Sequence, residues 1–197
     1  FNITEEIDEL KTKLANIESE LCKSAIELHN KRQSMANHLE ESISKELEDL
    51  GMKNVKFKVD IRVKRDPNGI CINGNRVSIT EHGIDEIEFL ISTNPGEPLK
   101  PLTKIISGGE SSRIMLALKS IMAKVDSISC LIFDEIDTGI GGRTAQAVGE
   151  KLSKLADEHQ ILCVTHSPQI ASIGDSHYLI KKETIGEHTS TRVYCVE

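Results

Sequence analysis

The chain has 197 residues, which is enough for one packed domain with a core of its own and an added element. Hydrophobic residues make up 38% and charged residues 28%, a balance that suits a globular protein with an extended, solvated part. No apolar run approaches the roughly 20 residues that a membrane-spanning helix requires. The composition therefore argues against a transmembrane role, and we expect no membrane partner.

The five cysteines form no C-x-x-C pair, and their number is odd. Cys130 and Cys163 lie in or beside apolar, strand-like runs, where a thiol behaves as a small hydrophobe. These features argue against a zinc site or a disulfide framework and favour a reducing, cytoplasmic location. The acidic first residues include no initiator Met and no apolar signal core, so we expect the sequence to be a piece of a longer protein.

The net charge of −7 is concentrated in the first quarter of the chain, because residues 1–50 hold 12 acidic and 6 basic residues. The chain as a whole therefore has no general attraction to nucleic acid, and any such contact must be local.

Residues 3–28 place apolar side chains at alternating steps of four and three, which predicts one strand of a coiled coil with a partner helix. The positions are Ile3, Ile7, Leu10, Leu14, Ile17, Leu21 and Leu28, with a gap at Ser24. The helix is expected to continue to about residue 50, with Gly51 as its cap. The alternative is an amphipathic helix that lies on its own domain.

Residues 55–64 alternate between apolar and charged side chains, which predicts a half-buried strand. We expect a turn at residues 66–69, a return strand from Ile70 and a further strand over 87–92, together forming a small antiparallel β region. The basic outer face of the first strand has two interpretations. It could lie along phosphates, or it could be a solvent face kept soluble by lysines.

The proline-rich segment 94–102 predicts a stiff loop, and an α/β pattern follows it. Helices are expected after Ser107, over 143–155 and from Ser167-Pro168, with strands over 130–133, 161–165, 178–182 and 192–196. The strand that ends in Asp134 and Glu135 is expected to be a buried parallel strand.

The helix that begins after Ser107 opens with Gly108 and Gly109. Because glycines carry no side chain, backbone N–H groups there could approach an anion at the positive end of the helix dipole. The alternative is a glycine turn with an ordinary Ser cap.

Asp134 and Glu135 end the next apolar strand, at the edge where open α/β sheets bind ligands. Asp134 suits Mg²⁺, which prefers oxygen ligands, and Glu135 could orient or deprotonate a water that attacks a phosphate. The alternative is two solvated acids at the end of a strand. His166 follows the later strand 161–165 and could donate to a phosphate oxygen, although a lone histidine is more often structural.

In this order the motifs resemble those of the ABC-ATPase superfamily. Ser107-Gly108-Gly109-Glu110 resembles its signature motif, and residues 131–135 resemble the Walker B strand with the catalytic glutamate. Asp137 lies where the superfamily has its D-loop aspartate, and His166 matches the switch histidine. The coiled-coil helix points to the SMC-like branch, in which the flanking residues resemble the RecN family of bacterial DNA-repair proteins. The matching stretches are 94–99, 107–118, 133–140, 142–147 and 164–171.

The resemblance implies an α/β fold that is the C-terminal half of an ABC-type ATPase head, with a parallel sheet flanked by helices. It implies three parts: a coiled-coil arm stub (1–51), a small antiparallel β region (52–93) and the ATPase lobe (94–197). No glycine in the chain is followed by lysine, so the phosphate-binding Walker A loop is absent from this sequence. The resemblance places that loop in an N-terminal lobe of the same protein, reached through the coiled coil.

The resemblance further implies that two ATP molecules, each with Mg²⁺, lie between two heads. Asp134, Glu135 and His166 would act on the nucleotide of their own head, and the Ser107–Glu110 loop would act on that of the partner. Hydrolysis would then open and close a dimer on DNA during double-strand-break repair, in the cytoplasm at the nucleoid. Two alternatives stay open: a structural or dimerisation module without ATP turnover, and a transporter ATPase subunit.

Overall fold

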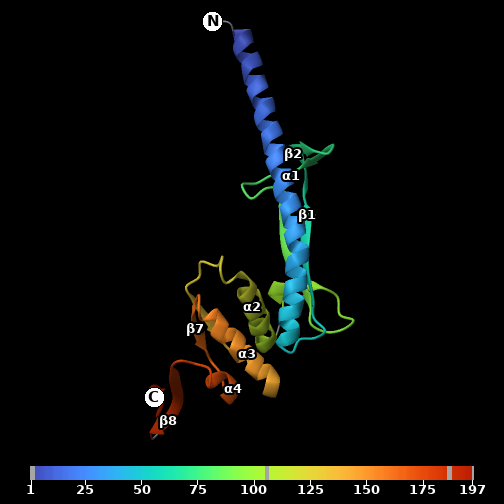
Figure 1. Cartoon of the computed structure of the whole chain (residues 1–197). Helices are drawn as coiled ribbons and strands as arrows, with labels where there is room; N and C mark the ends of the chain where they lie inside the picture. Colours follow the sequence, from blue (N-terminus) through green and yellow to red (C-terminus); the bar gives the residue numbers. More distant parts are fainter. Residues whose placement is uncertain (1–2, 105–106, 186–187, 197) are drawn as a thin grey trace. The chain divides into compact units, whose positions relative to one another are not determined.

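The computed structural model of the chain describes residues 3–104, 107–185 and 188–196. The fold is mixed α/β, with a long N-terminal helix and several small sheets, as the sequence predicts (Figure 1). The chain divides into two compact units, Phe1–Ser44 with Lys56–Lys104 and Lys45–Val55 with Ile105–Glu197. None of the helices in the described ranges has the length and apolar character that a membrane crossing requires.

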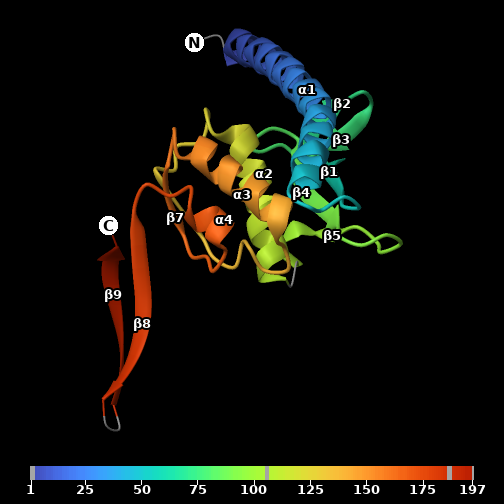
Figure 2. The same ribbon diagram turned by 60° about the horizontal axis from the view of Figure 1, so that its bottom comes forward.

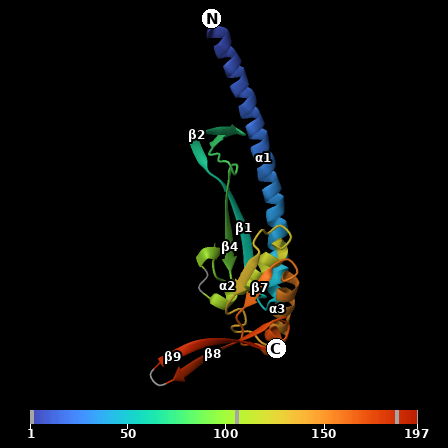
Figure 3. The same ribbon diagram turned by 90° about the vertical axis from the view of Figure 1, so that its left-hand side faces the viewer.

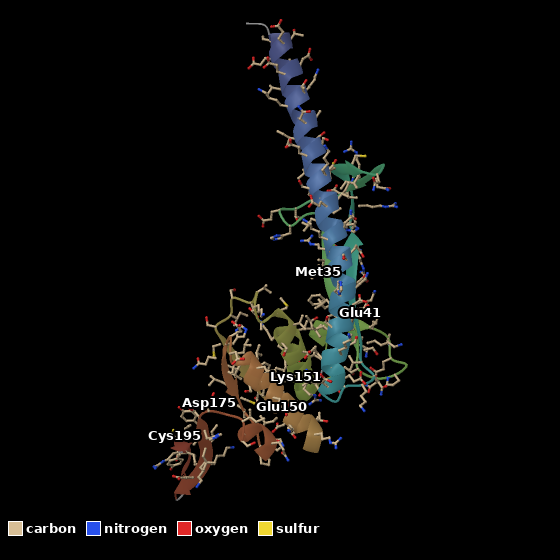
Figure 4. The ribbon with its side chains drawn as sticks, viewed as in Figure 1. Met35, Glu41, Glu150, Lys151, Asp175 and Cys195 are labelled. Carbon is tan, nitrogen blue, oxygen red and sulfur yellow. The ribbon has the colours of Figure 1, made fainter. Side chains whose placement is uncertain are left out.

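The first helix, α1 (Ile3–Asp49), confirms the predicted helix and contributes residues to both units. The seven apolar side chains of the heptad seam are between 36% and 66% exposed. Side chains extend from α1 along its length, among them the labelled Met35 and Glu41 (Figure 4). The seam therefore does not lie on the chain's own domain over residues 3–21, and its pairing with a partner helix stays a prediction.

Gly51 ends α1 in the way that the sequence predicts. Its φ of 80° lies in the left-handed region, the Gly51 N–H donates to the Glu48 carbonyl at 3.1 Å, and the Met52 N–H donates to the Leu47 carbonyl at 2.8 Å. These two bonds form a Schellman cap, which satisfies carbonyl groups that the helix leaves open.

The first unit contains an antiparallel sheet of β1 (Lys56–Val63), β4 (Asp85–Ser92) and β5 (Lys100–Pro101), in the order β1-β4-β5, followed by the short helix η1 (Leu102–Lys104). The sheet confirms the predicted strands at 55–64 and 87–92. Phe57 and Val59 are buried, as the alternation predicts. β1 lies beside α1 (Figure 3), and the Val59 N–H donates to the Glu40 carboxylate at 2.9 Å.

The prediction of a turn at residues 66–69 is wrong, because the turn lies farther along the chain. These residues belong to β2 (Arg65–Ile72), where an irregularity lets Arg65 and Ile70 both pair with Val77 of β3 (Asn75–Val77). The hairpin turn is Asn73-Gly74, with φ of 50° and 80°. Asn-Gly is the preferred pair for a turn in which both central residues have positive φ. The return strand from Ile70 therefore pairs with β3, while β1 pairs with β4.

The second unit follows the predicted α/β order. It contains α2 (Gly108–Met122), β6 (Cys130–Phe133), α3 (Gly142–Leu155), β7 (Gln160–Cys163) and α4 (Pro168–Ala171). The antiparallel ribbon of β8 (His177–Ile185) and β9 (His188–Val196) ends the chain (Figure 2). Strands β6 and β7 are parallel, with Phe133 opposite Cys163.

Only one face of the β6–β7 pair is buried among the described residues. Leu131 and Phe133 are 8% and 3% exposed, whereas Ile132 is 71% and Leu162 48% exposed. The predicted buried parallel strand is therefore parallel and buried on one face, while no described element covers the face that Ile132 occupies.

We expect Gly51→Ala to lower the free energy of unfolding of the chain. An L side chain in the left-handed region costs about 1–2 kcal/mol, and the added Cβ would lie 2.7 Å from the Thr144 methyl group. Gly96→Ala is the matched control, because Gly96 has a φ of 85° and nothing within 4 Å of the added Cβ. Urea unfolding should show the larger loss at position 51. Equal losses would mean that the Thr144 contact contributes nothing.

Candidate functional site

The start of α2 is capped by Ser107. Its hydroxyl accepts the Glu110 N–H at 3.5 Å, and its carbonyl accepts the Ser111 N–H at 3.0 Å. Ser107 has extended backbone angles, as a capping residue requires. The expected helix start is confirmed, and the backbone of the glycine pair forms its first turn.

The turn after β6 begins with the two predicted carboxylates. The Asp134 carbonyl accepts the Ser112 hydroxyl at 2.6 Å, which connects α2 to the end of β6. One carboxylate oxygen of Asp134 accepts the Glu135 N–H at 2.9 Å. Glu135 has a φ of 56°. Such a conformation costs a non-glycine residue roughly 1–2 kcal/mol and is often found at functional sites.

Both glycines of the α2 start pack directly against this turn. A Cβ on Gly108 would collide with the Glu135 carboxylate, and one on Gly109 would lie 3.0 Å from the Glu135 carbonyl and 3.1 Å from the Thr138 Cβ. The close backbone contacts therefore favour glycine at position 109, whereas a side chain at position 108 would require the flexible Glu135 carboxylate to move. The same contact brings the Glu135 carboxylate to the first turn of α2.

Asp137 joins the turn after β6 to the segment after β7. Its Oδ2 accepts the Thr165 hydroxyl at 2.5 Å, the His166 N–H at 2.9 Å and the Ser167 N–H at 3.0 Å. The residue is 2% exposed. Burial raises the pKa of the Asp137 carboxyl, but the hydrogen bonds from Thr165, His166 and Ser167 together hold that pKa below its ordinary value.

The His166 side chain is 82% exposed, and its Nδ1 lies 3.3 Å from Asp137 Oδ2. The backbone of His166 is therefore fixed by a hydrogen bond, while most of its imidazole ring faces outward. A histidine held in this way can present its ring to a ligand at the carboxyl edge of β6 and β7.

The thiol of Cys163, the last residue of β7, has a pKa that depends on its burial and on the charges at this edge. Burial raises the pKa of its thiol to about 11, and the negative charges of Asp137 and Asp134 act in the same direction. The thiol therefore stays protonated at neutral pH, and both carboxylates lie close enough to influence it.

Curated relatives identify the family. The chain is 42% identical to the DNA repair protein RecN of Bacillus subtilis over an alignment of 204 positions, which covers 97% of this chain and 35% of that protein. It is 45% identical over 161 residues to the DNA repair protein RecN of Treponema pallidum, covering 82% of this chain and 27% of that protein. The chain belongs to the RecN family. It spans about a third of the length of the curated relatives it matches.

No family model matches the chain. Among solved structures, the Smc head domain with a coiled coil and joint from Pyrococcus yayanosii has a TM-score of 0.51. It is 17% identical and covers 99% of this chain and 35% of that one. At this identity the likeness concerns the fold, and it agrees with the predicted SMC-like α/β fold of a RecN-family chain.

The structure brings some predicted site residues of this RecN-family chain together. Glu135 lies against Gly108 and Gly109, and Asp137 contacts the backbone and ring of His166. Ser107 and Glu110 share the first turn of α2. Asp134 follows β6 directly, with its carbonyl held by Ser112. The roles assigned to these residues in binding and catalysis stay predictions.

A magnesium ion at this edge would need oxygen ligands in addition to those of the described residues. No group of three or more His, Cys, Asp or Glu side chains is arranged around a metal position in the described part of the chain. Asp134 is exposed, and one of its oxygens is engaged by the Glu135 N–H. A single carboxylate suits Mg²⁺, which keeps several waters and takes further oxygens from phosphates. Asp134 is therefore compatible with the predicted role.

Three residues that orient these loops were not predicted from the sequence: Ser112, Arg113 and Thr165. The Arg113 guanidinium is buried and donates to the carbonyls of Ile136 at 3.2 Å and Thr138 at 3.0 Å. Burial lowers the Arg113 pKa from its ordinary value, and the negative charge of Glu110 opposes this. The sequence contained a signal for a buried role of Arg113, because this arginine shares the apolar face of α2 with Leu116 and Ala117.

Two basic side chains on the outer face of β1, in the first unit, are paired with carboxylates. Lys58 lies 3.0 Å from Glu40, and Arg62 pairs with Asp60; Lys64, which follows the strand, lies 4.0 Å from Glu86. These pairs neutralise much of the positive charge that a phosphate backbone would need. They favour the solvent-face interpretation over contact with nucleic acid.

We expect Asp137→Asn to lower the free energy of unfolding by about 1–3 kcal/mol near pH 7, because a charged acceptor of three hydrogen bonds is lost. A carboxyl with a depressed folded pKa stabilises the fold above its ordinary pKa of about 3.9, and this contribution is lost as the pH falls through the folded value. The difference between the variant and the original chain should therefore shrink below about pH 4.

Urea unfolding at a series of pH values measures this difference. Asp157→Asn, at an exposed aspartate after α3, is the matched control and should change little at any pH. A loss of unfolding free energy in Asp137→Asn that does not depend on pH would show that the charged Asp137 carboxylate is not its cause.

Proposed function

We propose that the chain is the C-terminal lobe of the head of an SMC-like ATPase that acts in the repair of DNA double-strand breaks. The observation that carries this proposal is the meeting of the α2 glycine pair with the Asp134-Glu135 turn in a member of the RecN family. Helix-opening glycines and strand-ending carboxylates are the parts from which nucleoside triphosphate sites are built.

ATP and Mg²⁺ are the proposed cofactors, and Mg²⁺ would neutralise charge on the transferred phosphoryl group when bound. Asp134 would supply a ligand oxygen to the ion. Glu135 would orient or deprotonate the attacking water, and the exposed His166 ring would donate to a phosphate oxygen. All three follow the carboxyl ends of β6 and β7, and a single ligand at that edge could therefore reach them.

Ser107, Gly108, Gly109 and Glu110 are proposed to contact a nucleotide held by a second head. The first turn of α2 offers backbone N–H groups and the positive end of the helix dipole. Because the Glu135 carboxylate now lies against Gly108, a phosphate at this turn requires that side chain to move.

The proposed partners are an N-terminal lobe of the same protein, a second head and DNA. The N-terminal lobe would supply the Walker A loop and would cover the exposed apolar face of β6 and β7, where Ile132, Leu162 and Val164 are 71%, 48% and 52% exposed. The exposed seam of α1 would pair with the other strand of the coiled-coil arm. The proposed location is the cytoplasm, at the nucleoid.

A second candidate is a structural or dimerisation module without ATP turnover. The packing of Gly109 against the Glu135–Thr138 turn supports it, because those backbone contacts favour glycine at this position without any ligand. The two candidates differ in what Glu135 does.

In the complete protein we expect Glu135→Gln to lower ATP turnover about 100-fold or more while nucleotide binding is retained, because the change removes the proposed base and leaves the shape of the side chain. Glu158→Gln, at an exposed glutamate after α3, is the control and should turn over normally. Phosphate release and equilibrium binding of a labelled nucleotide measure the two properties.

Normal turnover by Glu135→Gln would overturn the enzymatic proposal and leave the structural module. The isolated 197-residue chain should show no substantial turnover, because it lacks a Walker A loop.

A further inference from the structure

The Asp137 carboxylate already accepts hydrogen bonds from groups of its own chain. Oδ2 accepts three hydrogen bonds from three consecutive residues, Thr165 to Ser167. The Thr165 hydroxyl also accepts the Ser167 N–H at 3.0 Å, so it both donates and accepts within the same cluster. We call Asp137 and Thr165 the clamp.

Burial makes these bonds necessary. A carboxylate that is 2% exposed is costly unless hydrogen bonds replace its lost water, and three donors on one oxygen provide that replacement. The other oxygen, Oδ1, is buried and has no hydrogen-bond partner within the described ranges. Neither oxygen is thus exposed to an incoming nucleotide in this arrangement, although Asp137 matches the D-loop aspartate of the superfamily and we expected it to contact nucleotide.

The position of the clamp suggests a different role. Asp137 lies two residues after Glu135 in the turn that follows β6, and Thr165 directly precedes His166 after β7. The parallel pairing ends with the Val164 N–H bound to the Phe133 carbonyl at 2.9 Å, just before both segments leave the sheet. Beyond that bond, the clamp fixes the segment of Glu135 relative to the segment of His166.

We propose that Asp137 and Thr165 are positioning residues that hold the backbone of His166 at a fixed place relative to Glu135. This proposal rests on the proposed ATPase function and deepens it. The clamp aligns two groups that must meet the same phosphate, so its loss should slow turnover more than it weakens nucleotide binding. Misplacement of a reacting group by about 1 Å can cost about 100-fold in rate.

The test uses Thr165→Val in the complete protein, because valine has nearly the shape of threonine and lacks the hydroxyl. We expect kcat to fall about 10- to 100-fold, with the KM for ATP changed less than about threefold. Thr165→Ser keeps the hydroxyl and should restore kcat to within about threefold of the original. Thr191→Val, at an exposed threonine of β9, is the matched control and should leave both parameters unchanged.

A second measurement does not depend on turnover. In the 197-residue chain, Asp137→Asn should accelerate amide hydrogen exchange at His166 and Ser167, whose N–H groups donate to the carboxylate, by a larger factor than it accelerates exchange within α3. This measurement also serves if Thr165→Val fails to fold.

The outcomes separate the two proposals. A complete protein that hydrolyses no ATP overturns the proposed function, and the exchange measurement then decides on the clamp alone. If the unsubstituted complete protein hydrolyses ATP, an unchanged kcat in a folded Thr165→Val variant overturns the positioning role. A Thr165→Ser variant whose kcat is as low as that of Thr165→Val overturns it too. Unchanged exchange at both amides in Asp137→Asn overturns the clamp itself.

Discussion

Phe133 pairs with Cys163 where β6 and β7 end, and the Val164 N–H then donates to the Phe133 carbonyl. The candidate site depends on this parallel register, because it makes two segments that are distant in the sequence leave the sheet side by side. The burial of Asp137 follows from it, since Oδ2 can reach its three donors only when the segments leave together. A slip of the register by one residue would turn each side chain to the opposite face and remove these contacts.

The sequence predicted the elements of the second unit and the order of its motifs, because glycine, serine and carboxylate positions at the ends of helices and strands carry local signals. It did not predict that Gly108 and Gly109 would pack against the Glu135 turn, since that contact joins α2 to the segment after β6. The role of Thr165 was not predicted either, because its hydroxyl donates to Asp137, which is distant in the sequence. In the first unit, Asn68-Gly69 and Asn73-Gly74 carry the same hairpin signal, and the prediction placed the turn at the first pair, whereas the second has the positive φ angles. The local sequence does not distinguish the two, because the choice depends on which strands pair.

The chain spans about a third of its RecN relatives and exposes apolar surfaces that further parts of such a protein could cover. The heptad seam of α1 and the outer face of β6 and β7 both expose apolar side chains that water does not favour. Each has a proposed partner, a second arm helix and an N-terminal lobe. The basic face of β1 has its own carboxylates, so charge on that strand gives no support to a DNA contact there.

The Cys163 thiol gives this site a natural chemical sensor. Burial is the main cause of its pKa of about 11, and the repulsion between a thiolate and the carboxylates of Asp137 and Asp134 adds to it. Neutralising either carboxylate, by a bound cation or a substitution, weakens that repulsion and lowers the thiol pKa. More thiolate then forms at a given pH, and alkylation of this one cysteine becomes faster. The carboxyl edge of β6 and β7 thus sets the reactivity of Cys163 in two ways, through burial and through the charges of Asp137 and Asp134.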